Sequence, residues 1–281
     1  ALYETFQTLI DDGDEVVLLD PAWVSYEAMA KLAGGSLRRV DTAQYDFRLE
    51  DSLGDLHGEV TADTELLVLN SPGNPHGAVY SRTALERVRD LASEHDVTVI
   101  SDEIYDEITY EGGSPDRIGT LEGMRDRTIT VNGFSKAYAM TGWRLGYFAA
   151  PEAIVDAAGK LHSHSVSCAT NFVQRAGVEA LENTDAAVAE MVAAFQERRD
   201  LLVDLLDDRD VDVEPPQGAF YLMVPVADDD ASWCEAAIED AHVATVPGSA
   251  FGTPGFARFS YANSQSRLRE AIDRLDAADL L

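Results

Sequence analysis

The stretch VTVISDEIY, residues 97–105, joins a short apolar run to a group of polar side chains. The same design recurs in ELLVLN (65–70), which leads into SPGNPHG, and in TITV (128–131), which leads into NGFSK. Short apolar runs of this kind indicate strands. Because helical patterns separate them, the sequence predicts a mainly parallel sheet with helices covering both faces.

The elements expected on either side extend this α/β pattern. Further strands are predicted at 15–20, 37–41 and 145–150, and helices near 23–33 and 81–94. After Pro151 the pattern turns helical and includes a long amphipathic stretch from about 185 to 207. Strands at 219–226, 243–248 and 256–262, with helices near 232–241 and from about 264, then indicate a smaller α+β domain. We therefore expect a large domain at 1–183 and a small C-terminal domain at 184–281.

The charge balance of the chain is strongly acidic. Its 281 residues include 51 Asp and Glu against 21 Lys and Arg, a formal net charge of −30, while an apolar share of 46% can fill a core. Such a charge repels phosphate backbones and anionic membranes, so we expect neither nucleic acid nor membrane as a partner. Acidic residues lie singly and in short clusters between apolar segments, which favours a folded, halophilic protein in a cytoplasm of high salt.

Cysteines and the chain start give further expectations. Cys168 and Cys234 lie far apart and match no metal-ligand spacing, so we expect no metal site and a reducing, cytoplasmic location. The first residues do not resemble a signal peptide, and no apolar run of membrane-spanning length occurs. Leu2, Phe6 and Leu9 follow helical spacing without a capping residue, which suggests that preceding sequence is missing.

Polar residues that follow the strands are the candidates for a site. In open α/β sheets, ligands bind beyond the carboxyl ends of the strands. One sheet would bring Asn74, Asp102, Tyr105 and Lys136 to a single rim.

Lys136 is unusual because lysine is rare in this chain. It occurs only at positions 31, 136 and 160, so 18 of the 21 basic residues are arginine. A lysine after a strand is usually an ordinary surface residue. However, arginine stays protonated, whereas a lysine amine can lose its proton and attack a carbonyl. We interpret Lys136 as a candidate for that chemistry.

Two further groups suit a bound heteroaromatic cofactor. Asp102 could hold a ring nitrogen protonated and Tyr105 could donate to a ring oxygen. The alternatives are an ordinary helix N-cap for Asp102 and a core or rim aromatic for Tyr105. Arg144, in TGWRLGY, suits a phosphate or a surface ion pair. Arg258, in the middle of the strand FARFSYA, suits a carboxylate ligand or an edge position.

Seven stretches of the chain resemble a known family, in the family's order. They are DPAWVSYEAM, NSPGNPHGAVY, SDEIYDEITYEG, TVNGFSKAYAMTGWRLGYF, QGAFYLM, VATVPGSAFG and ARFSYA, which together span nearly the whole chain. The chain thus resembles the fold-type I pyridoxal-phosphate enzymes, specifically the class I/II aminotransferases of the aspartate aminotransferase group. The large domain would then be the one that binds the cofactor, pyridoxal 5'-phosphate (PLP).

The resemblance implies roles around the cofactor ring. Lys136 would form an imine with the cofactor and later move a proton. Asp102 would pair with the pyridine nitrogen, and Tyr105 and Asn74 would hydrogen-bond the ring oxygen.

It also implies roles around the phosphate and the substrate. Trp23 would stack on the ring, Arg144 would bind the phosphate, and Ser135 is a candidate second phosphate ligand. Arg258 would hold the substrate's α-carboxylate, with Trp23 and Asn74 also in contact with substrate.

Three departures from the family pattern stand out. His76 occupies a position where the family usually has threonine, and we expect it to fill the turn rather than carry protons. Gly133 replaces a frequent serine and offers no hydroxyl. The chain also begins just past the family's glycine-containing phosphate loop.

The resemblance predicts an aminotransferase that moves an amino group from an L-amino acid, aspartate or a similar one, to a 2-oxo acid such as 2-oxoglutarate. A homodimer is expected on the same ground. The alternatives are another fold-type I PLP reaction, such as that of a lyase or decarboxylase, and a non-catalytic ligand sensor.

Overall fold

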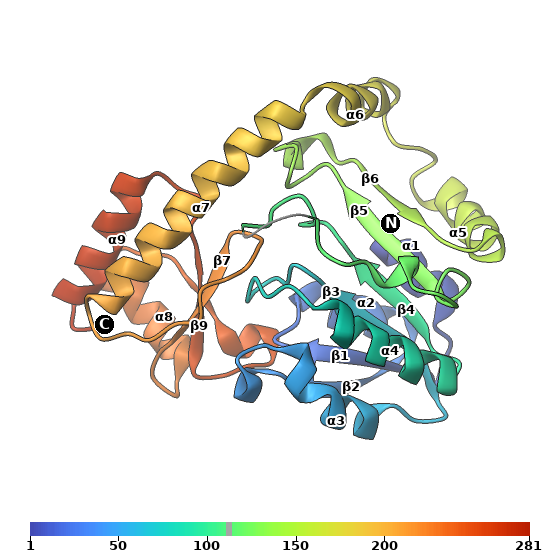
Figure 1. The fold of residues 1–281 in the computed structure, drawn as a ribbon, viewed down its shortest axis with the longest axis horizontal. Coiled ribbons are helices and arrows are strands. Elements are labelled where there is room, and N and C mark those ends of the chain that lie inside the picture. The colour runs from blue at the N-terminus through green and yellow to red at the C-terminus, as the bar shows by residue number, and fades with distance from the viewer. Residues whose placement is uncertain (111–113) are drawn as a thin grey trace.

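The computed structural model describes residues 1–110 and 114–281 and contains two sheets (Figure 1). The larger sheet has the order β2-β1-β3-β4-β5-β6; the first five strands run parallel, and β6 is antiparallel to β5. Its strands are β1 Glu15–Asp20, β2 Ser36–Asp41, β3 Thr64–Asn70, β4 Thr98–Asp102, β5 Thr128–Gly133 and β6 Gly146–Ala149. The predicted mainly parallel sheet is confirmed.

Helices cover both faces of this sheet. On one face, side chains such as Val16 and Leu18 pack against α1 (Leu2–Leu9) and α2 (Val24–Ala33). On the other face, their alternating neighbours on β1 pack against α3 (Leu49–Glu59) and α4 (Arg82–Glu94). Because successive side chains of a strand point to opposite faces, a strand with apolar residues at every position is buried on both sides.

Local signals in the sequence set the ends of these helices. The hydroxyl of Ser81 accepts a hydrogen bond of 3.2 Å from the backbone N–H of Ala84 and so caps α4. Gly34 ends α2 in the left-handed region, with φ 100, which costs glycine little. Ser264 caps α9 (Gln265–Ala277) in the same way as Ser81 caps α4.

The second half begins with helices and ends with a small antiparallel sheet. Its helices are α5 Glu152–Ser165, α6 Asn171–Asn183, α7 Asp185–Asp207, α8 Asp230–Glu239 and α9. The sheet has the order β7-β9-β8, with β7 Tyr221–Pro225, β8 Val246–Pro247 and β9 Phe256–Ser260. Single-turn helices are η1 Ala43–Tyr45, η2 Ile118–Thr120, η3 Thr141–Trp143 and η4 Gly248–Phe251. Figure 1 shows α7 running from α6 to this second sheet.

One expected strand is much shorter than the pattern suggested. Of the predicted 243–248, only Val246 and Pro247 pair with β9. Proline has no N–H to donate to the ladder, and the chain then turns into η4. An apolar sequence here therefore reflects packing beside α8 rather than a full strand.

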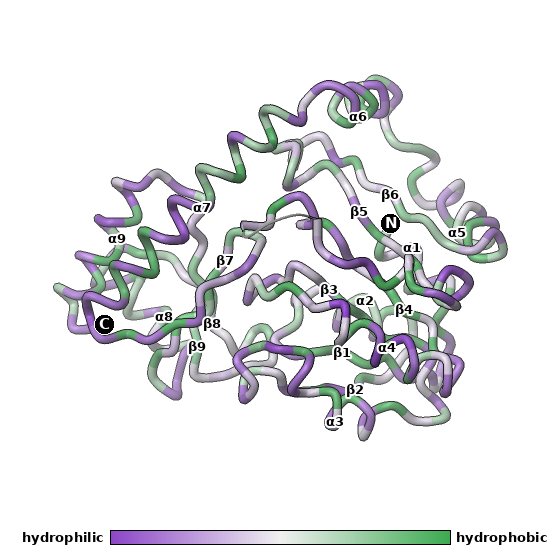
Figure 2. Tube along the Cα trace, viewed as in Figure 1, coloured by the Kyte–Doolittle hydropathy of each residue, from purple (hydrophilic) through white to green (hydrophobic). Residues whose placement is uncertain are grey.

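Segments that follow strands of the larger sheet share a hydrophobic core with the smaller sheet. Tyr105, Ile108 and Tyr110, which follow β4, belong to the same buried cluster as Leu222 of β7 and Phe259 of β9. Hydrophilic segments recur along outer helices such as α4 and α9 (Figure 2). Within the described residues, no helix combines the length and the hydropathy needed to cross a bilayer.

Candidate active site

A cavity of about 440 Å³ lies where β3, β4 and β5 end and β9 approaches them. All of the residues predicted from sequence line it, although they come from five separate segments of the chain. They are Trp23, Asn74, Asp102, Tyr105, Ser135, Lys136, Arg144 and Arg258. The carboxyl-end rule for parallel sheets thus located the cavity correctly.

Asp102 is the buried carboxylate of this cavity. It ends β4, is only 4% exposed, and its Oδ2 accepts a hydrogen bond of 2.6 Å from the hydroxyl of Tyr26. Its Oδ1 accepts a second bond, of 3.2 Å, from the backbone N–H of Ile104. Burial raises the pKa of Asp102 to about 6, and the Tyr26 hydrogen bond, the Ile104 N–H and the charge of Lys136 oppose that rise. A cation beside Asp102 would relieve this cost of burial.

Lys136 lies between two aromatic rings. Its Nζ is 5.4 Å from the ring centroid of Tyr105 and 5.5 Å from that of Phe220, which precedes β7. The primary amine of Lys136 therefore lies in the cavity between a ring that follows β4 of the larger sheet and a ring that precedes β7 of the smaller sheet. Ring faces attract the ammonium form without supplying a hydrogen-bond acceptor, so the amine stays available to a ligand.

Tyr105 is held as a neutral phenol. Its hydroxyl donates a hydrogen bond of 3.2 Å to the hydroxyl of Tyr221. Burial raises the pKa of Tyr105 far above its usual range, and the neighbouring Tyr221 adds to the rise. A neutral phenol can donate to an anionic oxygen in the cavity.

Arg258 presents a buried cation on the side of the second sheet. Its Nη1 donates a hydrogen bond of 3.0 Å to Oδ1 of Asn74, and its guanidinium lies 4.5 Å from the ring centroid of Tyr221 and 5.0 Å from that of Phe251. Burial lowers the pKa of Arg258. Its Nε is buried and has no hydrogen-bond partner among the described residues. An unpaired donor on a buried cation favours an anionic ligand.

The remaining predicted residues complete the cavity wall. Arg144 is in the left-handed region, with φ 58, and its Nη1 donates to the carbonyl of Thr141 at 2.7 Å. The hydroxyl of Thr141 in turn donates to the carbonyl of Ser135 at 2.6 Å. Trp23 packs edge-on against Tyr26, with ring centroids 5.4 Å apart.

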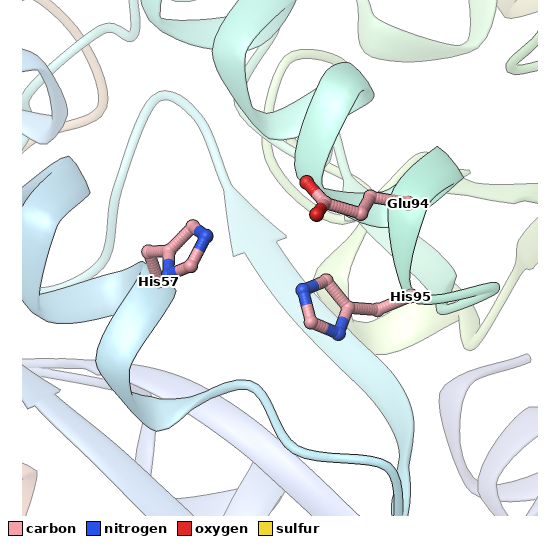
Figure 3. Close-up of side chains that lie close together, drawn as sticks. All are labelled: His57, Glu94 and His95. Carbon is pink, nitrogen blue, oxygen red and sulfur yellow. The ribbon is translucent and has the colours of Figure 1, made fainter.

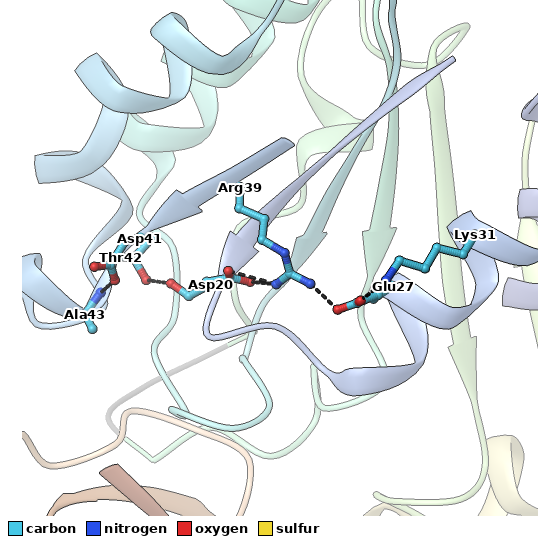
Figure 4. A network of polar contacts seen from close by, with 7 residues as sticks. All are labelled: Asp20, Glu27, Lys31, Arg39, Asp41, Thr42 and Ala43. Atoms are coloured by element: carbon cyan, nitrogen blue, oxygen red, sulfur yellow. Dashed lines mark hydrogen bonds and ion pairs between the residues drawn. The ribbon is translucent and has the colours of Figure 1, made fainter. Parts of the chain in front are cut away.

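A polar network supports the turn that carries Trp23 (Figure 4). Arg39 of β2 donates to Oδ1 of the buried Asp20 at 2.7 Å and also pairs with Glu27 of α2. The hydroxyl of Thr42 donates to the carbonyl of Asp20 at 2.7 Å. Burial raises the pKa of Asp20, which the hydrogen bond and charge of Arg39 oppose. These contacts fix the segment between β1 and α2.

Sequence reasoning missed three residues of the site. Tyr26 contacts Asp102, and Tyr221 joins Tyr105 to Arg258. Asn70 donates to the carbonyl of Asp102 at 2.9 Å through its side-chain amide. Asn70 is the last residue of its strand, so the carboxyl-end rule could have found it. The two tyrosines are indistinguishable from core aromatics in the sequence.

Two of the three departures from the family pattern, His76 and Gly133, have structural explanations. His76 is buried against Phe47, its Nδ1 accepts from the N–H of Ala78 at 3.0 Å, and burial lowers its pKa to about 4. A neutral histidine therefore fills the turn. At Gly133, a Cβ atom would lie 3.1 Å from Cα of Gly146 and from the carbonyl of Leu145, so the close approach of β6 disfavours a larger residue.

Comparisons with known proteins agree with this geometry. The family model for aminotransferase class I and II matches residues 1–275. An aspartate aminotransferase from Thermotoga maritima is 41% identical over 98% of this chain and 72% of its own length. An aromatic-amino-acid aminotransferase from Thermococcus litoralis is 40% identical over 96% of this chain and 71% of its own.

Solved structures show the same relationship. The aspartate aminotransferase of Thermus thermophilus with maleate superimposes with a TM-score of 0.94 at 39% identity, covering 99% of this chain and 73% of that one. The aromatic aminotransferase of Pyrococcus horikoshii gives 0.95 at 39% identity, covering 100% and 78%. The chain belongs to the class I and II aminotransferases. It is a PLP-dependent transaminase, an enzyme that transfers amino groups.

The cavity residues fit PLP. The buried carboxyl of Asp102 suits a protonated pyridine nitrogen, the amine of Lys136 suits an aldehyde, and the neutral Tyr105 suits a ring oxygen. The Nε of Arg258, which has no partner among the described residues, suits the carboxylate of an amino acid.

Proposed function

We propose that this chain moves the amino group of an L-amino acid, aspartate or a similar one, to a 2-oxo acid such as 2-oxoglutarate, with PLP as its cofactor. The observation that carries the proposal is the meeting of Lys136, Asp102 and Arg258 in one cavity of about 440 Å³. The relatives named above are aspartate and aromatic-amino-acid aminotransferases, which favours amino transfer over the lyase, decarboxylase and sensor alternatives.

Each residue has a distinct part in this proposal. When bound, PLP supplies an aldehyde and a ring that withdraws electrons from the substrate's α-carbon. Asp102 holds the ring nitrogen in its protonated form, and Tyr26 orients that carboxylate. Lys136 would act as a general acid and base that moves a proton to and from the substrate's α-carbon.

Other residues of the cavity orient the substrate and hold the phosphate. Arg258 holds the α-carboxylate, with Asn74 fixing the guanidinium and Trp23 covering the ring. Arg144 and Ser135 bind the phosphate. Arg258 binds a carboxylate that every α-amino acid carries, and the choice of aspartate is supported by relatives that are aspartate aminotransferases.

The test is a visible absorption spectrum of the protein loaded with PLP in concentrated potassium chloride, followed by addition of single amino acids. An amino acid should bleach the visible absorption band of the loaded protein. Addition of 2-oxoglutarate should restore that band and release one equivalent of glutamate. Lys136→Ala should abolish the band, whereas Lys160→Ala, on the exposed side of α5, should leave it unchanged. Release of carbon dioxide or ammonia without amino transfer would contradict the proposal.

We also propose a homodimer, in which a second copy covers an apolar surface on η3, β6, α5 and α6. Trp143, Tyr147 and Val155 are 47%, 45% and 43% exposed, and Phe172 of α6 is 67% exposed. A group of large exposed apolar side chains is typical of a protein–protein interface. Sedimentation should show a dimer that Phe172→Asp weakens. The control Leu32→Asp, at an exposed position of α2, should not weaken it.

A cytoplasm of high salt is the environment we propose. The net charge of −30 is distributed along the chain, and screening by salt reduces its self-repulsion. Both cysteines are free thiols, which suits a reducing compartment.

A further inference from the structure

Three potential metal ligands meet at the ends of two helices, outside the cavity described above (Figure 3). His57 lies in the last turn of α3, Glu94 is the last residue of α4, and His95 follows it. One ligand atom from each side chain lies within 4.8 Å of those of the other two. The side chains come from distant parts of the sequence, so spacing alone gives no sign of the cluster.

One of these potential ligand atoms is buried without a hydrogen-bond partner among the described residues. Nε2 of His95 is buried and makes no hydrogen bond to any described residue. The rings of His57 and His95 meet edge to face, with centroids 5.9 Å apart. In Figure 3 the ring of His95 presents a nitrogen toward the space between His57 and Glu94. A buried nitrogen without a partner costs free energy that a bound ion would recover.

The electrostatic surroundings favour a cation. Both α3 and α4 end here, and helix C-termini carry partial negative charge. The nearby Arg127 is occupied by Asp96 at 3.0 Å and by the carbonyl of Ala92 at 3.2 Å. Among the described residues, Glu94 has no ion-pair partner. The carboxylate is therefore free to serve a metal ion.

We propose that His57, Glu94 and His95 bind a divalent transition-metal ion of the zinc class, with water completing the coordination. Two imidazole nitrogens and one carboxylate suit zinc, whereas magnesium and calcium prefer oxygen ligands alone. Bonds of about 2.0–2.2 Å imply ligand atoms about 3.3 Å apart. His57 and Glu94 are exposed, so rotation of their side chains can close the remaining gap.

Such an ion would join α3 to α4 on one face of the larger sheet. It would bind the folded chain, in which the ligands are assembled, more tightly than the unfolded one. The thermal midpoint should therefore rise with the logarithm of the free metal concentration.

The test is equilibrium dialysis of the metal-stripped holoenzyme against Zn²⁺, in potassium chloride without chelating buffer. Cys168→Ser serves as the background, because it removes the exposed thiol. One equivalent per chain should bind. His57→Gln and His95→Gln should each weaken binding at least tenfold, and Glu94→Gln should weaken it less. His242→Gln, at an exposed histidine beyond α8, is the matched control and should bind as the background does.

Two further measurements distinguish this site from zinc bound elsewhere on the protein. Co²⁺ in place of Zn²⁺ should give visible bands that His57→Gln removes, and excess Mg²⁺ should not compete. Because His57 is exposed, its variant should fold even if the partly buried His95 variant does not. Equal zinc binding in the background and in His57→Gln, or no binding in the background, would overturn the proposal. Neither measurement depends on transaminase activity.

Discussion

The hydroxyl of Tyr26 on α2 donates a hydrogen bond of 2.6 Å to Oδ2 of Asp102 at the end of β4. Both side chains are buried, and burial raises the pKa of each. The tyrosine therefore stays a donor, and the carboxylate accepts its bond in the ionised form. A helix on one face of the sheet thus adjusts the acidity of a group at the sheet's rim.

Removing the hydroxyl should raise the pKa of Asp102 further. We expect Tyr26→Phe to lower kcat/KM by about tenfold to a hundredfold, since one hydrogen bond to a charged group contributes roughly 1.5–3 kcal/mol. The acidic limb of the pH–rate profile should move to higher pH. Tyr45→Phe, at a half-buried tyrosine on η1 outside the cavity, is the control. An unchanged acidic limb in Tyr26→Phe would show that Tyr26 does not affect the pKa of Asp102.

Asp102 should make the cofactor-free protein less stable as the pH rises. Its pKa is raised from 3.8 to about 6, so between these values the native state holds a proton that the unfolded state has released. Stability therefore falls as pH rises through this window, by on the order of 3 kcal/mol in total. Asp102→Asn cannot ionise and should lack the fall.

Urea unfolding of the cofactor-free protein at several pH values measures this effect. Asp63→Asn, at an exposed aspartate, corrects for the change in net charge. The Asp102→Asn variant should also lose at least a hundredfold in transamination, because an amide cannot hold a ring nitrogen protonated. Parallel pH dependences in the wild type and Asp102→Asn would refute the assignment.

Arg258 should control substrate affinity more than turnover of bound substrate. We expect Arg258→Gln to raise KM for both the amino acid and the 2-oxo acid by about a hundredfold, since a buried charge-assisted pair is lost. Arg267→Gln, on exposed α9, should leave both values unchanged. Steady-state kinetics with each substrate varied in turn decides the point, and a change confined to kcat would contradict it.

Two glycines should respond to alanine in opposite ways. Gly77 has φ +71, and a Cβ there would lie 2.6 Å from the carbonyl of Gly218, so Gly77→Ala should destabilise the fold by more than about 2 kcal/mol. Gly54 lies inside α3 with nothing within 4 Å, so Gly54→Ala should stabilise it by about 0.5–1 kcal/mol. Equilibrium unfolding in urea compares the two variants.

Salt should stabilise the protein over a wide range. With a net charge of −30, self-repulsion falls as ions screen the surface. Unfolding midpoints in potassium chloride should therefore rise steadily from low to molar concentration, and sodium chloride should act similarly if screening is the cause. A flat midpoint would remove the case for a saline cytoplasm.

Much of the large sheet could be read from the sequence because its strands β1, β3 and β4 are buried on both faces. Residues 66–69 (LLVL) have no polar position, and polar side chains that meet in the cavity follow the carboxyl ends of such runs. The division of the chain at residues 183 and 184 stays a prediction. The core shared by Tyr110 and Phe259 crosses it, although α6 ends at Asn183.

Contacts between distant segments explain what the sequence could not reveal. Tyr26 and Tyr221 acquire their roles only when α2 and β7 reach the ends of β4 and the turn after it. In the same way, His57 meets Glu94 and His95 only when α3 and α4 pack side by side. Local periodicity reports which residues are buried, and it does not report which neighbours they meet.

The bond between Arg258 and Asn74 limits how this enzyme could be recombined with its relatives. The two side chains come from distant segments of the chain, one on β9 and one in the loop after β3. A chimaera that took its C-terminal part from another transaminase would need an asparagine-like acceptor opposite the imported guanidinium. Libraries that exchange the N-terminal and C-terminal parts of such enzymes should therefore take positions 74 and 258 from the same parent.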